Sequence, residues 1–263
     1  MLLEWPLASV IEFARAQGFR AIEVWADFPH AHPDEMLADE RARIRKALTG
    51  FERVSLHGPL GNASLASINP GIRSESLREH LAAVELAHDL GAGILVTHPG
   101  DLRDRRFKAE AHRLSQDALA RLADRGHRLG VTIAVENCGP YHAGIDQTTE
   151  DLVSLVSGVG SAHLKVCLDT GHAAVNKNVG ELIAAFGTAI VHAHVHDNHG
   201  HRDEHLPMGR GSIDFSLVRP MLDRLDGVAV AEVVWERGRS TESPEELARA
   251  AREGWEKVAI TSR

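Results

Sequence analysis

Cysteine is scarce in this sequence and long apolar runs are missing, and each shortage excludes a class of protein. Cys138 and Cys167 are the two cysteines among 263 residues, too few for a disulfide framework, and we expect both in the core as small apolar residues. No apolar run approaches the roughly 20 residues needed to span a membrane. Glu4 and Pro6 interrupt the segment where a signal peptide has its apolar stretch. We therefore expect a cytoplasmic protein with no membrane partner.

Basic and aromatic residues are also in short supply. Lys and Arg total 29 against 37 Asp and Glu, so the formal net charge is −8, the opposite sign to that of most proteins that bind phosphate backbones. Aromatic residues make up 5% of the chain, with Tyr141 as the one tyrosine, so nucleic-acid bases would find few side chains to stack on. The composition disfavours nucleic acid as the principal ligand.

Histidine, in contrast, is abundant, with 17 residues in the chain. Its side chain binds metals and titrates near neutral pH. This abundance favours metal binding or proton transfer. With 43% hydrophobic and 25% charged residues, the rest of the composition is that of an ordinary globular protein.

Short β-branched and aliphatic runs alternate with longer amphipathic segments, a pattern typical of βαβ units around a parallel sheet. The predicted strands are 21–25, 53–56, 93–97, 132–136, 164–168, 190–196 and 228–233. The predicted helices are 7–17, 33–49, 73–90, 106–129, 149–157, 179–186, 215–225 and 244–258.

This order predicts an α/β protein, a (β/α)8 TIM barrel that forms a single domain over residues 1–263. The strands fall one short of the eight of such a barrel, and only residues 1–4 precede the first helix. Either these residues supply a short first strand, or the natural chain begins upstream and the first strand is missing here.

Ionisable residues follow the later predicted strands at about the spacing of one βα unit. They are His57, His98, Glu136, Asp169 with His172, His194 and Glu232. Because all parallel strands of a barrel end on the same face, these groups should meet in one bowl. A histidine at one strand end is often structural, but the repetition over successive strands favours a shared site for divalent metal.

Other histidines have simpler interpretations. His30 and His32 follow the strand 21–25 and are expected on a loop at the mouth of the barrel, where His30 could contact substrate. The histidines at 80, 88, 112 and 127 fall on helical patterns and are expected at the surface.

The residues at the strand ends carry a family resemblance. The chain resembles the xylose isomerase-like TIM barrels, the superfamily that contains the endonuclease IV enzymes and many sugar isomerases and epimerases. The matching segments are VSLHGP at His57, LVTHPG at His98, IAVENC at Glu136, CLDTGHA at Asp169 and His172, HAHVHDN at His194, RDEHLPMGRGSIDF at Asp203 and His205, and AEV at Glu232.

The resemblance implies one of two metal sites. The epimerase branch implies one divalent ion on Glu136, Asp169, His194 and Glu232. The endonuclease IV branch implies up to three zinc ions: His57 and His98 bind the first with bridging Glu136, the residues Asp169, His194 and Glu232 bind the second, and His172, Asp203 and His205 bind the third. Such donors also accept manganese, iron or cobalt.

The charge of the site differs between these alternatives. Three divalent ions with four carboxylates leave +6 − 4 = +2, which suits an anionic phosphoester. One divalent ion with three carboxylates leaves +2 − 3 = −1, which suits a neutral polyol. Asp203 and His205 are therefore the residues that discriminate between the alternatives.

Our leading hypothesis is a trinuclear zinc hydrolase that acts on a small or medium phosphoester. A metal-bound hydroxide next to Glu136 would attack phosphorus, the third ion on His172 would stabilise the leaving oxygen, and Arg202 or Arg210 would hold a phosphate oxygen. Duplex DNA is a disfavoured substrate, because Gly58, Pro59 and Leu60 stand where the DNA-repair enzymes carry an aromatic wedge.

The alternative is a mononuclear sugar or sugar-phosphate isomerase or epimerase. Glu136 and Glu232 would then act as the acid/base pair, with His172 and Arg202 positioning the terminal hydroxyls. A metal-dependent binder without catalytic activity is a third hypothesis, which the complete set of ligands disfavours.

Overall fold

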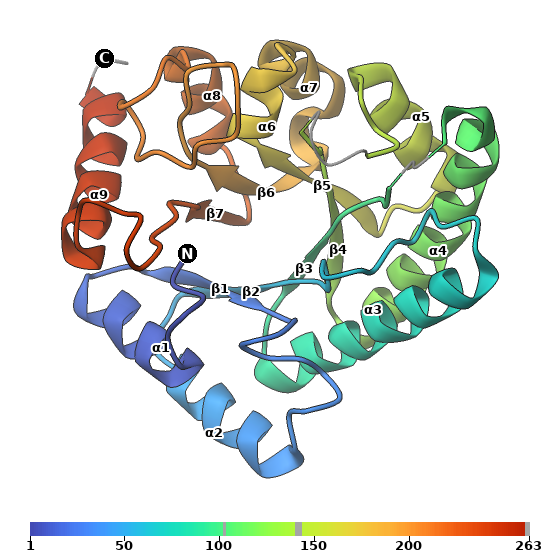
Figure 1. Ribbon diagram of the computed structural model, residues 1–263, viewed down its shortest axis with the longest axis horizontal. Helices are drawn as coiled ribbons and strands as arrows, with labels where there is room; N and C mark the ends of the chain where they lie inside the picture. The colour runs from blue at the N-terminus through green and yellow to red at the C-terminus, as the bar shows by residue number, and fades with distance from the viewer. Residues whose placement is uncertain (102–103, 140–143, 261–263) are drawn as a thin grey trace.

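Parallel strands form the centre of the molecule. The computed structural model describes residues 1–101, 104–139 and 144–260, with side chains up to residue 257, and Tyr141 lies outside these ranges. A 7-stranded sheet pairs in chain order, and helices surround the strands (Figure 1). The strands are β1 (Ala21–Trp25), β2 (Arg53–His57), β3 (Ile94–Thr97), β4 (Thr132–Glu136), β5 (Leu164–Asp169), β6 (Ile190–Val195) and β7 (Val228–Ala231). The predicted α/β barrel is confirmed.

Each strand is followed by helix, as the sequence predicts. The helices are α1 (Leu7–Ala16), α2 (Ala38–Leu48), α3 (Pro70–Leu90), α4 (Lys108–Leu129), α5 (Thr149–Val159), α6 (Thr170–Val175), α7 (Val179–Phe186), α8 (Phe215–Leu222) and α9 (Pro244–Ile260). Gly91 and Gly130 end α3 and α4 in the left-handed conformation, which glycine adopts without steric cost.

Two helical regions differ from the prediction. The helix expected from residue 33 begins at Ala38, because the carbonyls of Pro33 and Met36 accept hydrogen bonds from the guanidinium of Arg41 instead of continuing a helix. The short helix α6 was not predicted, since 6 residues are too few to show a helical period. Its first turn is set by Asp169, whose Oδ1 accepts from the backbone N–H of His172 at 2.6 Å.

Residues 1–6, which precede α1, form no strand. Strands β1 and β7 lie next to each other, but no strand pairing joins them among the described residues. Met1 stands between their ends (Figure 1), where its amino group donates to the carbonyl of Val233 and its carbonyl accepts from Trp235 at 3.2 Å. These bonds join Met1 to the segment that follows β7, and the isolated β-bridges of the described residues do not include Met1. The expectation of a short or missing first strand is confirmed.

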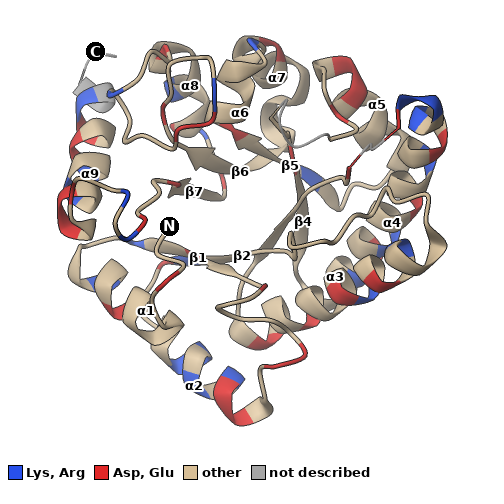
Figure 2. Ribbon diagram, in the orientation of Figure 1, with Lys and Arg blue, Asp and Glu red and all other residues tan. Residues whose placement is uncertain are grey.

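The core lies between the strands and the inward faces of the helices. Leu119 and Leu122 of α4 pack there against Ile133 of β4, and all are fully buried. Both cysteines are buried and unbridged, as predicted. Charged residues are frequent along the outer helices (Figure 2). None of the described helices is long and apolar enough to cross a bilayer.

The prediction that the histidines on helices lie at the surface is wrong for His80. His88 and His127 are exposed and His112 is half-buried, but His80 is 2% exposed. Its Nδ1 donates to the carbonyl of Ser76 at 2.7 Å. The inward face of α3 holds the ring against the end of β2, a tertiary contact that no helical pattern shows. Burial lowers the pKa of His80 to about 4, so the ring is neutral at physiological pH.

We predict that His80 makes stability sensitive to acid. Its pKa is about 4 when folded and about 6.5 when unfolded, so its full contribution is present above about pH 6.5 and is lost as the pH falls to about 4. Between about pH 7.5 and pH 5 it should remove about 2 kcal/mol from the free energy of unfolding. The variant His80→Asn, whose amide can retain the bond to Ser76, should lack this component in urea unfolding. Equal pH dependence in both proteins would contradict the assignment.

Gly171 of α6 generates a second prediction, because it lies against the buried ring of His196. A Cβ at Gly171 would come within 2.0 Å of Cε1 of His196, whereas Gly180 on α7 has open space around it. Gly171→Ala should lower the free energy of unfolding by about 1–3 kcal/mol through overpacking. Gly180→Ala is the matched control and should not destabilise the protein. Urea titrations that give the two variants the same stability would refute this account.

Candidate metal centre

The predicted metal ligands meet at the end of the barrel where the strands finish. His57, Glu136 and Asp169 end β2, β4 and β5, and His194 lies one residue before the end of β6. His98 and Glu232 directly follow β3 and β7, and Asp203 and His205 lie on the loop after β6. Asp169 caps α6 and so places His172 at the same end.

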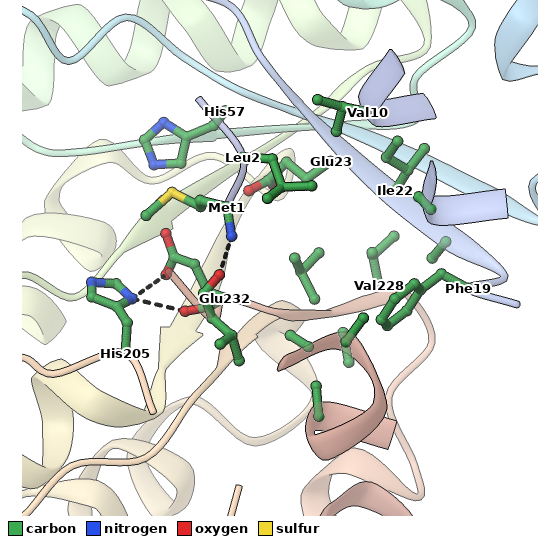
Figure 3. Close-up of a pocket in the computed structure, with 18 of the residues that line it drawn as sticks. Met1, Leu2, Val10, Phe19, Ile22, Glu23, His57, His205, Val228 and Glu232 are labelled. Carbon is green, nitrogen blue, oxygen red and sulfur yellow. Dashed lines mark hydrogen bonds and ion pairs between the residues drawn. The ribbon is translucent and has the colours of Figure 1, made fainter. Parts of the chain in front are cut away.

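A cavity of about 950 Å³ opens onto this group. Its polar end includes His57, His205 and Glu232, and its apolar part continues between β1 and β7, with Ile22 and Val228 in the lining (Figure 3). The volume falls within the range of small-molecule sites.

Glu136 is the centre of the first cluster. Its Oε2 accepts from Nε2 of His57 at 3.2 Å and from Nε2 of His98 at 3.1 Å. Its Oε1 lies 3.1 Å from Nδ1 of His194. Burial by itself would raise the pKa of Glu136, but the charges of His194 and His98 outweigh burial and hold that pKa well below its ordinary value. In return, Glu136 raises the pKa of His57 to about 9 against the effect of burial.

A second cluster forms around Nδ1 of His194. This atom lies 3.1 Å from Oε1 of Glu136, 3.5 Å from Oε2 of Glu232 and 3.8 Å from Oδ2 of Asp169. The residues come from the ends of four consecutive strands, β4 to β7. Three carboxylate oxygens therefore lie within 3.8 Å of this one nitrogen, and these are the four residues to which the resemblance assigns a single divalent ion.

Asp203 is the centre of a third cluster. Its Oδ2 lies 3.3 Å from Nε2 of His172 and 2.9 Å from Nε2 of His205, and its Oδ1 lies 3.7 Å from Nδ1 of His196. Burial would raise the pKa of Asp203, but its hydrogen bonds with His172 and His205 hold the pKa far below the ordinary value. The pKa of His205 is raised to about 9, because Asp203 and Glu232 outweigh burial.

These donors fit divalent cations. Nδ1 of His196 and Oδ1 of Asp203 are buried and have no hydrogen-bond partner among the described residues. The carboxylates are balanced by imidazoles with raised pKa values, so a bound ion would replace protons and release them. Imidazole and carboxylate oxygen together suit zinc and other first-row metals. Groups of donor atoms close enough to share an ion include His57, His98 and Glu136; Glu136, Asp169 and His172; Asp169, His196 and Glu232; and His196, Asp203 and His205.

The predicted substrate-binding residues divide into two groups. His30 lines the cavity, where its Nε2 bonds the carbonyl of Trp5 at 3.1 Å. The two arginines are not among the residues that line it, and their predicted role in substrate binding stays a prediction. Arg202 is 76% exposed and pairs with Glu204, and Arg210 pairs with Glu242 on the surface. Sequence proximity to Asp203 did not reveal that this loop turns both guanidiniums outward.

Sequence reasoning missed several polar residues of the barrel interior. Glu23, His192 and His196 all contact predicted ligands. A signal for them existed, because residues 192, 194 and 196 alternate along one strand and so share a face. The same period places Glu23 on the inner face of β1, between Ala21 and Trp25. Polar residues on the inner face of a barrel strand are unusual and could have been recognised.

Comparison with known proteins agrees with this architecture. The model of the xylose isomerase-like TIM barrel family matches residues 11–258. An uncharacterized protein of Methanocaldococcus jannaschii is 29% identical over 68% of this chain, and the match spans 64% of that protein. A fructoselysine 3-epimerase of Shigella flexneri is 25% identical over 87% of this chain and 86% of its own length. A Mycobacterium ulcerans protein named "Probable endonuclease 4" is 24% identical over 89% of this chain and 90% of its own.

Solved structures share the fold over nearly the whole chain. A D-tagatose 3-epimerase-like protein superposes with a TM-score of 0.86 at 24% identity, over 99% of this chain and 96% of that one. A Thermus thermophilus protein soaked with ZnCl2 superposes with a TM-score of 0.77 at 27% identity, over 98% and 97% of the two chains. Because the family model also covers almost all of the barrel, the chain belongs to the xylose isomerase-like TIM barrel family.

Proposed function

We propose that the protein is a metal-dependent sugar epimerase. The observation that carries this proposal is the convergence of Glu136, Asp169 and Glu232 on Nδ1 of His194. The similarity to a fructoselysine 3-epimerase over most of both chains supports the same class of reaction. Our leading hypothesis from the sequence was phosphoester hydrolysis, and the relatives favour the alternative.

The two glutamates supply the acid and base of an epimerisation. Inverting a carbon next to a carbonyl requires a group that removes a proton from one face and a group that returns a proton to the other. Glu136 ends β4 and Glu232 follows β7, and each contacts Nδ1 of His194 through one carboxylate oxygen. In the proposed reaction one glutamate would remove the proton from one face of the substrate carbon and the other would return a proton to the opposite face. A divalent ion on Glu136, Asp169, His194 and Glu232 would polarise the neighbouring carbonyl.

Further residues of the cavity suit the rest of a polyol. Nε1 of Trp25 is buried without a hydrogen-bond partner among the described residues, and Trp25 lines the cavity. His172 and His30 line the same cavity and are placed to contact substrate hydroxyls.

The proposal predicts exchange of a carbon-bound proton with solvent. Incubated in deuterated water with a panel of ketoses, the protein should incorporate deuterium at the carbon next to the carbonyl. Glu136→Gln and Glu232→Gln should each slow this exchange by about 10²–10⁴-fold, and chelation should abolish it until metal is restored. Glu85→Gln on the surface of α3 is the control with unchanged exchange. If no ketose of the panel incorporates deuterium, the proposal is contradicted.

A trinuclear phosphoester hydrolase is the second candidate. It is favoured by the further donor groups, His57 with His98 and Asp203 with His205, which lie beyond the site for one ion. The similarity to the protein named "Probable endonuclease 4" is compatible with it.

Metal content and turnover separate the two candidates. The epimerase proposal predicts about one tightly bound ion per chain and no turnover of a phosphodiester such as bis(p-nitrophenyl) phosphate. The hydrolase candidate predicts about three zinc ions and turnover that Asp203→Asn and His205→Ala remove. Elemental analysis of purified protein with a phosphodiesterase assay measures both quantities.

A further inference from the structure

A buried polar chain lies beneath the metal centre, and of its members only His194 takes part in the proposed reaction. It consists of Glu23 on β1, Ser55 on β2, Cys167 on β5, and His192 and His194 on β6. Ser55, Cys167 and both histidines have no exposed surface, and the Glu23 side chain is 10% exposed. Figure 3 shows Glu23 with His57 and Met1 around the same cavity. Polar groups are costly at such depth unless every one of them is paired.

The contacts of Glu23 leave its carboxylate fully engaged. Oε1 accepts from Nε2 of His194 at 2.9 Å. Oε2 lies 3.1 Å from Nε2 of His192 and accepts from Oγ of Ser55 at 3.2 Å. Further along the chain, Sγ of Cys167 lies 3.3 Å from Nδ1 of His192. One carboxylate therefore joins two imidazoles that stand two positions apart on the same strand.

The direction of these hydrogen bonds fixes how the rings carry their protons. An ionised carboxylate accepts and cannot donate, so Nε2 of His194 must carry the hydrogen that points at Glu23. In the neutral ring the lone pair is then on Nδ1. That is the atom surrounded by Glu136, Asp169 and Glu232, and a metal requires a lone pair there.

We propose that Glu23 is a positioning residue for metal binding, which holds the His194 ring in the orientation and tautomer that present Nδ1 to the ion. Ser55 and His192 keep the carboxylate in place from the other side. The inference rests on the metal binding of the proposed function and is independent of its substrate.

Glu23→Gln tests the proposal with almost no change in size. One carboxylate oxygen becomes an NH2 group, which must face an imidazole N–H or the Ser55 hydroxyl as a second donor. If the His194 ring turns or takes the other tautomer, Nδ1 loses the lone pair it offers. Loss of such a partner typically weakens metal affinity by about 10–100-fold. We expect that change in the Kd for Zn²⁺, measured on the full chain by competition with a chromogenic chelator.

Glu52→Gln is the matched control. Glu52 directly precedes β2, lines the cavity and pairs with Arg20 in a largely exposed ion pair. The variant removes the same charge without touching a histidine of the metal centre. Its Kd should differ from wild type by less than about 2-fold, because exposed charges contribute little.

A double-mutant cycle shows whether Glu23 acts through His194. In a His194→Asn background, Glu23→Gln should weaken Zn²⁺ binding by less than about 2-fold, since the group it positions is gone. The same loss with and without His194 would overturn the proposal, as would an unchanged Kd in Glu23→Gln alone. If Glu23→Gln does not fold, Glu23→Asp takes its place, because a carboxylate one methylene shorter cannot reach both histidines.

The Zn²⁺ affinity of the wild-type protein distinguishes a failure of this inference from a failure of the proposed function. Wild-type protein that binds no Zn²⁺ contradicts both. If wild type and Glu23→Gln bind Zn²⁺ with the same Kd, the positioning role of Glu23 is contradicted and the proposed function is not. Absence of sugar epimerisation leaves the metal-affinity comparison intact.

Discussion

One buried carboxylate, Glu136, organises the whole functional end of this barrel. Its two oxygens contact His57, His98 and His194, which belong to three other strand ends. A carboxylate at this depth is costly without partners, and the surrounding imidazoles compensate that cost only where the strands hold them in place. The position of the strands and the charge balance of the site therefore depend on each other.

The pairing of a carboxylate with imidazoles recurs on both sides of Glu136 along the barrel. Asp203, on the loop after β6, and Glu23, on β1, are each held by more than one imidazole. The raised pKa values of His57 and His205 show that protons supply the positive charge which divalent ions would otherwise provide. Metal binding then amounts to an exchange of protons for a cation at fixed geometry.

The side of the barrel between β1 and β7 forms the substrate side of the site. A complete barrel fills its interior with layers of side chains, whereas here the cavity runs on between β1 and β7. Met1 closes the upper end of this gap through its hydrogen bonds with Val233 and Trp235, next to Glu232. Burial lowers the pKa of the Met1 amino group to about 6.

Much of the barrel and its site could be predicted from the sequence, because both follow from periodicity. Apolar runs that end in His57, Glu136 or Asp169 give strand positions to within a few residues, and parallel strands must end on one face. The family was recognised from the same segments. Glu23 and His196 could have been found by reading the alternation along β1 and β6, but this period was applied to the apolar residues alone.

Other features were decided by tertiary contacts that no local pattern encodes. The burial of His80 depends on how α3 packs against β2, and the outward course of Arg210 depends on its pairing with Glu242, 32 residues further along the chain. The sequence by itself determined which groups stand at the strand ends, since strand period and chain order are local properties. Only the tertiary structure decided which of those groups share a proton or a carboxylate, because that requires distances between strands, and these arise from the closure of the sheet.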